Sequence, residues 1–295
     1  MPLDQDQLEQ PFRKLRKLLK NLSDEPSPEA VHDLRTRIRR IEAIMHALRL
    51  DGRRDGRQLL KSVGSIRKKA GQVRDMDVLT SFASTLNSDL EKECHVQLLE
   101  HLGVERSRAM QKLHDSVTAE QDDARRRLKG HSVLITKGFQ KSTKEDLSKR
   151  EWPADATALA LRLSSELADW PPLRRDNLHP FRLKVKELRY VLQTGNVQDS
   201  RLVKTLGEVK DAIGEWHDWT ELAAIAREAL DHDRGCKLIK QIRSRADAKF
   251  DRALSLAVRM RKRYLGVDNN TGAARRTKLT RVKDPILSTA AKLAA

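Results

Sequence analysis

The sequence predicts an all-α protein built from two similar helical bundles in tandem. Apolar residues recur at helical spacing along nearly all of the 295 residues, and no convincing run of alternating strand residues is present. Hydrophobic residues make up 38% of the chain and charged residues 34%, a balance that favours helices with solvated outer faces over a sheet sandwich. Two segments of the first half also reappear in the second half in the same order, which indicates an internal duplication.

The first half contains four predicted helical segments. They are a basic helix over 5–22, a helix from Pro28 to about Leu50, a third over 55–72, and a long stretch from Asp75 toward Lys129 that is interrupted near Gly103. Ser27 is the expected N-cap of the second helix, because Pro28 suits the first helical position. Residues 130–144 form the least regular segment and are expected to separate the two halves.

The second half repeats this organisation. The predicted helices are 154–169, 177–193 and 199–215, followed by a long final segment over 217–265. We therefore expect one domain over 1–265, made of two helical repeats at about 5–130 and 151–265. Residues 266–295 are expected to form a basic, mobile tail.

Two matched helices carry unusual rows of cations. The first stripe is His32, Arg35 and Arg39, and the second stripe is His179, Arg182, Lys186 and Arg189. Within each row the residues fall within about 80° of one another on a helix, beside an apolar arc. Like charges one turn apart repel and weaken a helix, so a neutralising partner is expected. That partner is predicted to be an anion.

A second matched pair of segments, 64–75 and 207–218, follows the two stripes at a similar distance along the chain. Arg supplies a planar fork of donors for phosphate oxygens, Lys a mobile charge, and His a donor that responds to pH. The formal net charge of +17 fits phosphate-rich polymers, nucleic acid or an anionic membrane surface. Only 4% of residues are aromatic, which argues against base stacking as the main mode of binding.

Over roughly residues 5–265 the sequence resembles the conserved histidine α-helical domain (CHAD) family. The matching residues are the two stripes with Arg40 and Tyr190, the segment 73–79, and the segments 206–209 and 216–218. The resemblance implies two pseudo-symmetric four-helix bundles around a basic cleft or pore. It also implies that the chain binds inorganic polyphosphate.

The predicted ligand-binding residues follow from the stripes and the helices after them. Arg35, Arg39, Arg182, Lys186 and Arg189 are expected to make most contacts, with His32 and His179 as additional donors, Arg37, Arg40 and Lys184 at the rim, and Arg67 and Lys210 as further donors. Glu42 and Glu187 replace the Arg that is usual in the family and are expected to pair with neighbouring cations. Pro180 is compatible with this geometry only if His179 lies at the very start of its helix.

Asp75 and Asp218 occupy matched positions where each half is expected to turn from one helix to the next. One interpretation is that each carboxylate orients a site cation such as Arg74 or His217. The favoured interpretation is an N-cap, a role that Asp performs well.

Catalysis is not expected. The dipeptides His32-Asp33 and His217-Asp218 resemble the start of a metal-dependent phosphohydrolase site, but their helical neighbours are Arg and Lys, which would repel a metal ion. The sequence has no nucleotide-binding P-loop. We therefore expect no metal, no cofactor and no chemistry on the ligand.

Two other classes of protein are alternatives to a polyphosphate-binding protein. A nucleic-acid-binding protein would suit the charge equally, although base-reading residues are not evident on the stripes and non-specific binding at low salt is expected. A helical scaffold with an incidental basic surface is the third class. Two cysteines far apart, a polar N-terminus and no apolar run of about 18 residues predict a cytoplasmic protein without a membrane span. Association with polyphosphate granules is a further expectation.

Overall fold

The computed structural model describes residues 5–47, 50–87, 91–141, 152–194, 200–230 and 236–267. Within these ranges the chain is helical and contains no strand, which confirms the all-α prediction. The chain divides into two compact units, the first formed by residues 1–88 and 92–150 and the second by residues 89–91 and 151–295. Each unit has its own hydrophobic core.

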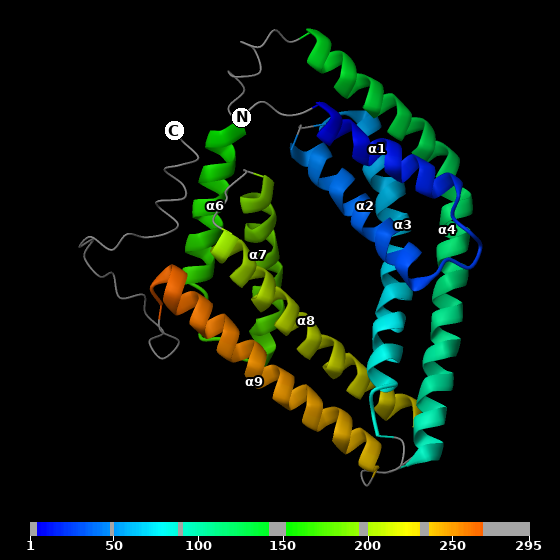
Figure 1. Ribbon diagram of the computed structural model, residues 1–295, viewed down its shortest axis with the longest axis vertical. Helices are drawn as coiled ribbons and strands as arrows, with labels where there is room; N and C mark the ends of the chain where they lie inside the picture. The colour runs from blue at the N-terminus through cyan, green and yellow to red at the C-terminus, as the bar shows by residue number, and fades with distance from the viewer. Residues whose placement is uncertain are drawn as a thin grey trace. The chain divides into compact units, whose positions relative to one another are not determined.

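Unit 1 contains the first four helices of the chain. They are α1 (Gln5–Lys20), α2 (Pro28–Ala47), α3 (Arg54–Ala83) and α4 (Lys92–Lys141) (Figure 1). Each helix packs against the next, and α1 also packs against α4. The apolar face of α2 supplies Leu34, Ile38 and Ile41, all fully buried, to this core. Burial of this face fixes which side of α2 remains at the surface.

Unit 2 contains the remaining described helices. They are α6 (Trp152–Ala168), α7 (Arg175–Thr194), α8 (Ser200–Ala229) and α9 (Lys237–Leu265) (Figure 1). The same order of packing recurs, since each helix contacts the next and α6 also contacts α9. Phe181 and Val185 of α7 are fully buried in the core. Among the described helices, none is long and apolar enough to cross a membrane.

The start of α2 follows the predicted capping pattern. The backbone N–H of Ala30 donates a hydrogen bond to Ser27 Oγ at 3.3 Å, and the helix begins at Pro28. Ser27 therefore satisfies one of the free N–H groups of the first turn, as its position before a proline predicts.

Several predicted helix ends are wrong, because the apolar face continues past them. Helix α3 runs to Ala83 rather than ending near residue 72, with Val73 and Leu79 still buried. Helix α4 passes through Gly103 without interruption and includes residues 130–141, while residues 142–144 lie outside the described ranges. Glycine in a helix costs only about 1 kcal/mol, which the packing of a long helix exceeds.

The long helices of unit 2 show the same effect. Helix α8 extends to Ala229 instead of ending at residue 215, and buries Trp216, Trp219 and Leu222 beyond that point. The predicted segment 217–265 is therefore divided between α8 and α9. Gly266 ends α9 in the left-handed conformation at φ 66°, which suits a residue without a Cβ. Beyond Val267 the predicted tail lies outside the described residues.

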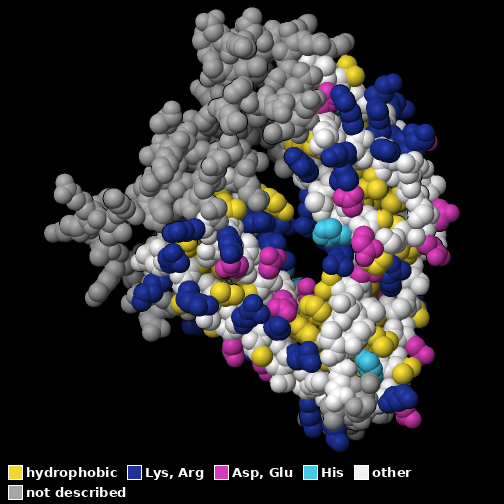
Figure 2. All heavy atoms as spheres, viewed as in Figure 1, with side chains coloured by type: hydrophobic (Ala, Val, Ile, Leu, Met, Phe, Trp, Pro, Cys, Tyr) yellow, Lys and Arg dark blue, Asp and Glu magenta, His cyan; other side chains and the backbone are white. Residues whose placement is uncertain are grey.

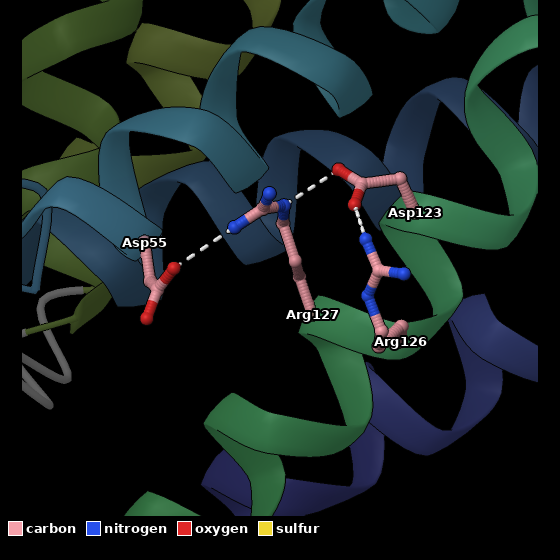
Figure 3. Close-up of polar contacts among 4 residues, drawn as sticks. All are labelled: Asp55, Asp123, Arg126 and Arg127. Atoms are coloured by element: carbon pink, nitrogen blue, oxygen red, sulfur yellow. Dashed lines mark hydrogen bonds and ion pairs between the residues drawn. The ribbon is translucent and has the colours of Figure 1, made fainter.

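A network of ion pairs joins α4 to the beginning of α3 (Figure 3). Arg127 donates from Nε to Asp123 Oδ2 at 2.6 Å and from Nη1 to Asp55 Oδ1 at 2.9 Å, and Arg126 also pairs with Asp123. These contacts raise the pKa of Arg127, and Arg127 lowers the pKa of the Asp123 carboxyl. The network holds in place the first turn of α3, the helix that faces the first stripe.

In unit 2 a buried arginine donates hydrogen bonds to carbonyl groups at the C-terminal end of α6. Arg261 of α9 is 2% exposed and donates from Nη2 to the carbonyl oxygens of Ala168 at 3.1 Å and Trp170 at 2.5 Å. Burial lowers the pKa of Arg261. A cation is favourable here because the last carbonyls of a helix carry partial negative charge.

Candidate anion-binding site

The first stripe lies along α2 at the border of the buried face. Arg35 and Arg39 are half-buried, whereas His32 and Arg40 are exposed. The neighbouring residue Leu34 is fully buried. The cations therefore stand beside the core, as the helical spacing predicts.

Arg35 is the centre of a cluster of positive charge in unit 1. Its side chain is 20% exposed, and its Nη1 lies 3.6 Å from Asp75 Oδ1 on α3. Burial lowers the pKa of Arg35, Asp75 opposes that shift, and the nearby guanidinium groups of Arg39, Arg74 and Arg67 lower the pKa further. An anion at this position would relieve the repulsion between these groups.

Glu42 of α2 pairs with Arg67 of α3, one of the cations near Arg35. Arg67 Nε donates to Glu42 Oε1 at 2.8 Å, which confirms that Glu42 pairs with a neighbouring cation. The pair is partly buried, with side-chain exposures of 35% and 22%. One predicted donor of unit 1, Arg67, is therefore already paired with a carboxylate. In the second stripe the position equivalent to Glu42 is Arg189, which is a cation.

The second stripe lies along α7 in unit 2. His179, Arg182, Lys186 and Arg189 are all half-buried. Lys186 Nζ stands 5.8 Å from the ring centroid of Tyr190, within range of a cation–π interaction. Arg182 Nε donates to the backbone carbonyl oxygen of Lys210 on α8 at 3.0 Å. The second stripe is thus in direct contact with the helix that follows it.

The expected position of His179 is wrong. Helix α7 begins at Arg175, so His179 lies in its second turn rather than at its start. Asn177 holds that start, since its Oδ1 accepts from Arg174 N at 2.8 Å and its Nδ2 donates to Pro172 O at 2.9 Å. Pro180 has no N–H for the carbonyl four residues earlier, and the packing of the helix outweighs this loss.

Two of the three cations predicted at the rim, Arg37 and Lys184, form ion pairs with carboxylates. Lys184 Nζ lies 2.8 Å from Glu166 and 3.5 Å from Glu187, which confirms that Glu187 pairs with a cation. Arg37 Nε donates to Asp33 at 2.8 Å. Arg37 and Lys184 are therefore weaker candidates for ligand contacts than the stripes. Of the added donors, Lys210 has its ammonium 2.6 Å from the carboxylate of its neighbour Asp211.

The N-cap interpretation of Asp75 and Asp218 is wrong. Both lie well inside long helices, α3 and α8, because these helices continue past the predicted ends. Asp75 faces Arg35, as described above, and Asp218 Oδ1 lies 3.7 Å from His217 Nδ1. Each carboxylate is thus placed to orient a cation of the candidate site, the interpretation that sequence reasoning ranked second.

Two histidines from neighbouring helices meet in unit 2. The ring centroids of His179 and His217 are 4.3 Å apart, and Glu221 Oε1 lies 3.9 Å from His217 Nε2. Burial lowers the pKa of His179, and the adjacent charges of His217 and Arg182 lower it further. Asp218 raises the pKa of His217, with a contribution from Glu221. His217 is therefore the member of the pair that carries a proton more readily near neutral pH.

Sequence reasoning left two of these residues out of the predicted site. Arg74 contributes to the cluster around Arg35, and His217 contacts His179. The signal was present, because the alignment of 64–75 with 207–218 pairs Arg74 with His217. These residues were missed because each was assigned to a helix end, where its side chain would not face the stripe.

The stripes differ from the general basic character of the chain. Figure 2 shows Lys and Arg side chains spread over much of the visible face of both units, with Asp and Glu side chains among them. Several cations outside the stripes form local pairs, such as Arg108 with Glu105 and Arg125 with Asp122. A dense cluster such as that around Arg35 is a more specific feature than net charge.

The fold and the stripes together define a helical protein with a cationic row in each of two units. A family profile described as CHAD domain matches residues 6–227, most of the chain. The protein belongs to the CHAD domain family. No curated protein and no solved structure matches the chain significantly.

Proposed function

We propose that this protein binds inorganic polyphosphate through the two stripes without changing it chemically. The observation that carries the proposal is the environment of Arg35, a half-buried cation that lies near the guanidinium groups of Arg39, Arg74 and Arg67, with the carboxylate of Asp75 3.6 Å from its Nη1. Such a cluster is stabilised by a ligand that brings several negative charges close together. Membership of a family associated with polyphosphate binding supports the same ligand.

The spacing of the stripes suits a linear polyanion. Residues three and four positions apart lie one above the other on a helix face, about 5 Å apart along the axis. Successive phosphates of an extended chain meet successive cations in this arrangement. Each contact is a charge-assisted hydrogen bond, and planar guanidinium groups match phosphate oxygens especially well.

The proposal also includes expectations that come from the sequence and the family. These are an internal duplication with pseudo-symmetric bundles around a basic pore, a cytoplasmic location and an association with polyphosphate granules. The arrangement of packed helices recurs in both units, which supports the duplication. A non-catalytic role is proposed because the His179–His217 pair is adjacent to Arg182, whose charge disfavours a bound metal ion.

The test is calorimetric titration with polyphosphate of defined length, in competition with duplex DNA at physiological salt. We expect tight polyphosphate binding that DNA does not displace, because the stripes place several donors within one helix face. Affinity should fall as salt rises and increase with polymer length until the cations are occupied. Equal competition by DNA would instead support a non-specific nucleic-acid-binding protein.

The proposal predicts a pH dependence that arises from His217. Asp218 raises the pKa of His217, and a bound polyanion raises it further, so binding takes up protons. Affinity should therefore increase by about twofold to fivefold as the pH falls from about 8.5 to about 7. His179 contributes little in this window because burial lowers its pKa.

The comparison of wild type with His217→Gln isolates this effect, since titration of the ligand itself affects both proteins equally. His114→Gln is the control, because His114 on α4 also lies beside a carboxylate, 3.5 Å from Asp24, and belongs to neither stripe. Loss of the pH dependence in His217→Gln alone supports the assignment. An unchanged pH profile in that variant contradicts it.

A further inference from the structure

Glycines recur at the contact between each stripe helix and the helix that follows it. Helix α3 carries Gly64 and Gly71, and α8 carries Gly207 and Gly214, so both pairs are seven residues apart. A Cβ built on any of these four glycines would meet a charged side chain of the preceding stripe helix. The facing residues are Glu42 for Gly64, Arg35 for Gly71, Arg189 for Gly207 and Arg182 for Gly214.

The closest approach is at Gly214. A Cβ there would lie 2.7 Å from Arg182 Nη2 and 3.2 Å from both Cζ and Nε of the same guanidinium group. The group therefore lies directly over the backbone of α8, in space that any other residue would fill. Arg182 keeps this position only because residue 214 has no side chain.

The same glycine exposes the hydrogen-bond partner of Arg182. Arg182 Nε donates to the carbonyl oxygen of Lys210, which lies four residues before Gly214. Side chains on a helix point toward its N-terminus, so a Cβ at position 214 would cover this carbonyl. Without that Cβ the carbonyl accepts a lateral donor in addition to the helical hydrogen bond.

We propose that Gly214 is a positioning residue for anion binding, and that Gly207 has the same role for Arg189 to a smaller degree. The inference rests on the proposed function, because it concerns how the second stripe is presented to its ligand. The Nε contact with Lys210 fixes the plane of the Arg182 guanidinium with Nε and Nη2 against α8, and the rest of the planar group is then presented to the ligand in one orientation. A fixed fork loses less conformational entropy when it binds phosphate than a free side chain does.

The three contacts with arginine form a graded series that a single kind of substitution can test. The built Cβ meets Arg182 at 2.7 Å at position 214, Arg189 Nε at 3.4 Å at position 207, and Arg35 at 4.0 Å at position 71. Gly103 and Gly130 of α4 have nothing within 4 Å and are matched controls, because they are also helical. The displaced atoms at position 214 are the end of a flexible side chain, so the fold should tolerate alanine.

The experiment measures polyphosphate affinity and thermal unfolding of the five Gly→Ala variants. We expect Gly214→Ala to lose affinity by about fivefold to tenfold, Gly207→Ala to lose less, and Gly71→Ala and both controls to remain unchanged. Alanine raises helix propensity, so none of these variants should unfold at a lower temperature through its backbone. A loss of affinity without a loss of stability is a result that a purely structural role does not give.

A double-mutant cycle with Arg182→Ala links the effect to its proposed cause. Gly214→Ala should cost nothing further once Arg182 is absent; an equal additional loss in that background would overturn the inference. If Arg182→Ala lowers affinity but Gly214→Ala does not, the positioning role fails and the proposed function stands. If Arg182→Ala itself leaves affinity unchanged, the use of the second stripe in the proposed function fails.

Arg182→Lys provides an independent measurement if Gly214→Ala does not fold. Lysine keeps the charge but cannot donate to Lys210 and present a fork to phosphate at the same time. We expect affinity to fall by about the same factor as in Gly214→Ala, about fivefold to tenfold. Unchanged affinity would show that charge alone matters at this position and would reject the inference.

Discussion

The double variant Arg35→Glu/Arg182→Glu is expected to lose polyphosphate affinity by about 100-fold or more. Each substitution removes a half-buried cation at the centre of a stripe and adds a negative charge that repels phosphate. Arg35 stands among other guanidinium groups, so an anion there would relieve their repulsion. Arg182 is held against α8 by its hydrogen bond to Lys210, so its orientation is set before a ligand binds. Calorimetric titration of the folded variant measures the loss, and circular dichroism checks the fold.

A control must show that the loss of polyphosphate affinity does not come from the change in net charge alone. The control Arg108→Glu/Arg162→Glu changes the formal charge by the same amount, one residue in each unit, at side chains that are each 66% exposed. These arginines form only local pairs on α4 and α6 and should affect affinity slightly. Equal losses in the two double variants would mean that the protein binds through its overall charge rather than through the stripes.

Glu42→Arg is expected to raise polyphosphate affinity by about tenfold. The substitution breaks the 2.8 Å pair with Arg67, which frees that guanidinium, and places a new cation on α2. Glu42 Oε1 lies 3.8 Å from a Cβ built at Gly64. At the equivalent position of unit 2, Arg189 faces Gly207. An arginine at position 42 therefore has space over the glycine that the fold already provides.

The matched control for this gain is Glu105→Arg on α4. It also removes a carboxylate from an ion pair, in this case with Arg108 at 2.5 Å, and changes the net charge equally. Higher affinity in Glu42→Arg alone, measured by titration at constant salt, places the gain in the first stripe. If both variants gain equally, or neither gains, the assignment of Glu42 as the residue that weakens this stripe is wrong.

The positions of the stripes beside the core could be predicted from the sequence. Helical periodicity alone places Arg35 next to Leu34 and Ile38, and both apolar residues are fully buried while Arg35 stays half-buried. This succeeds because side-chain direction on a helix depends on local geometry, which is the same in every helix. The pairing of Glu42 with a cation was also predictable, because a carboxylate surrounded by many cations usually forms an ion pair with one of them.

The ends of the long helices could not be predicted in the same way. Gly71 and Gly103 are residues that weaken a helix locally, yet α3 and α4 continue through them. Burial of apolar residues on the far side of each glycine outweighs its backbone cost, and that burial exists only after the helices have packed. The error placed Asp75 at a helix end and concealed its contact with Arg35.

The sequence by itself determined the all-helical fold and the cationic faces of α2 and α7, because both depend on the periodicity of neighbouring residues. Only the tertiary structure decided which groups of α3 and α8 face these cations. The contact of Arg182 with Lys210 spans two helices and depends on the absence of a side chain at Gly214. Such a contact is created by the close approach of two backbones, and no local pattern in the sequence records that distance.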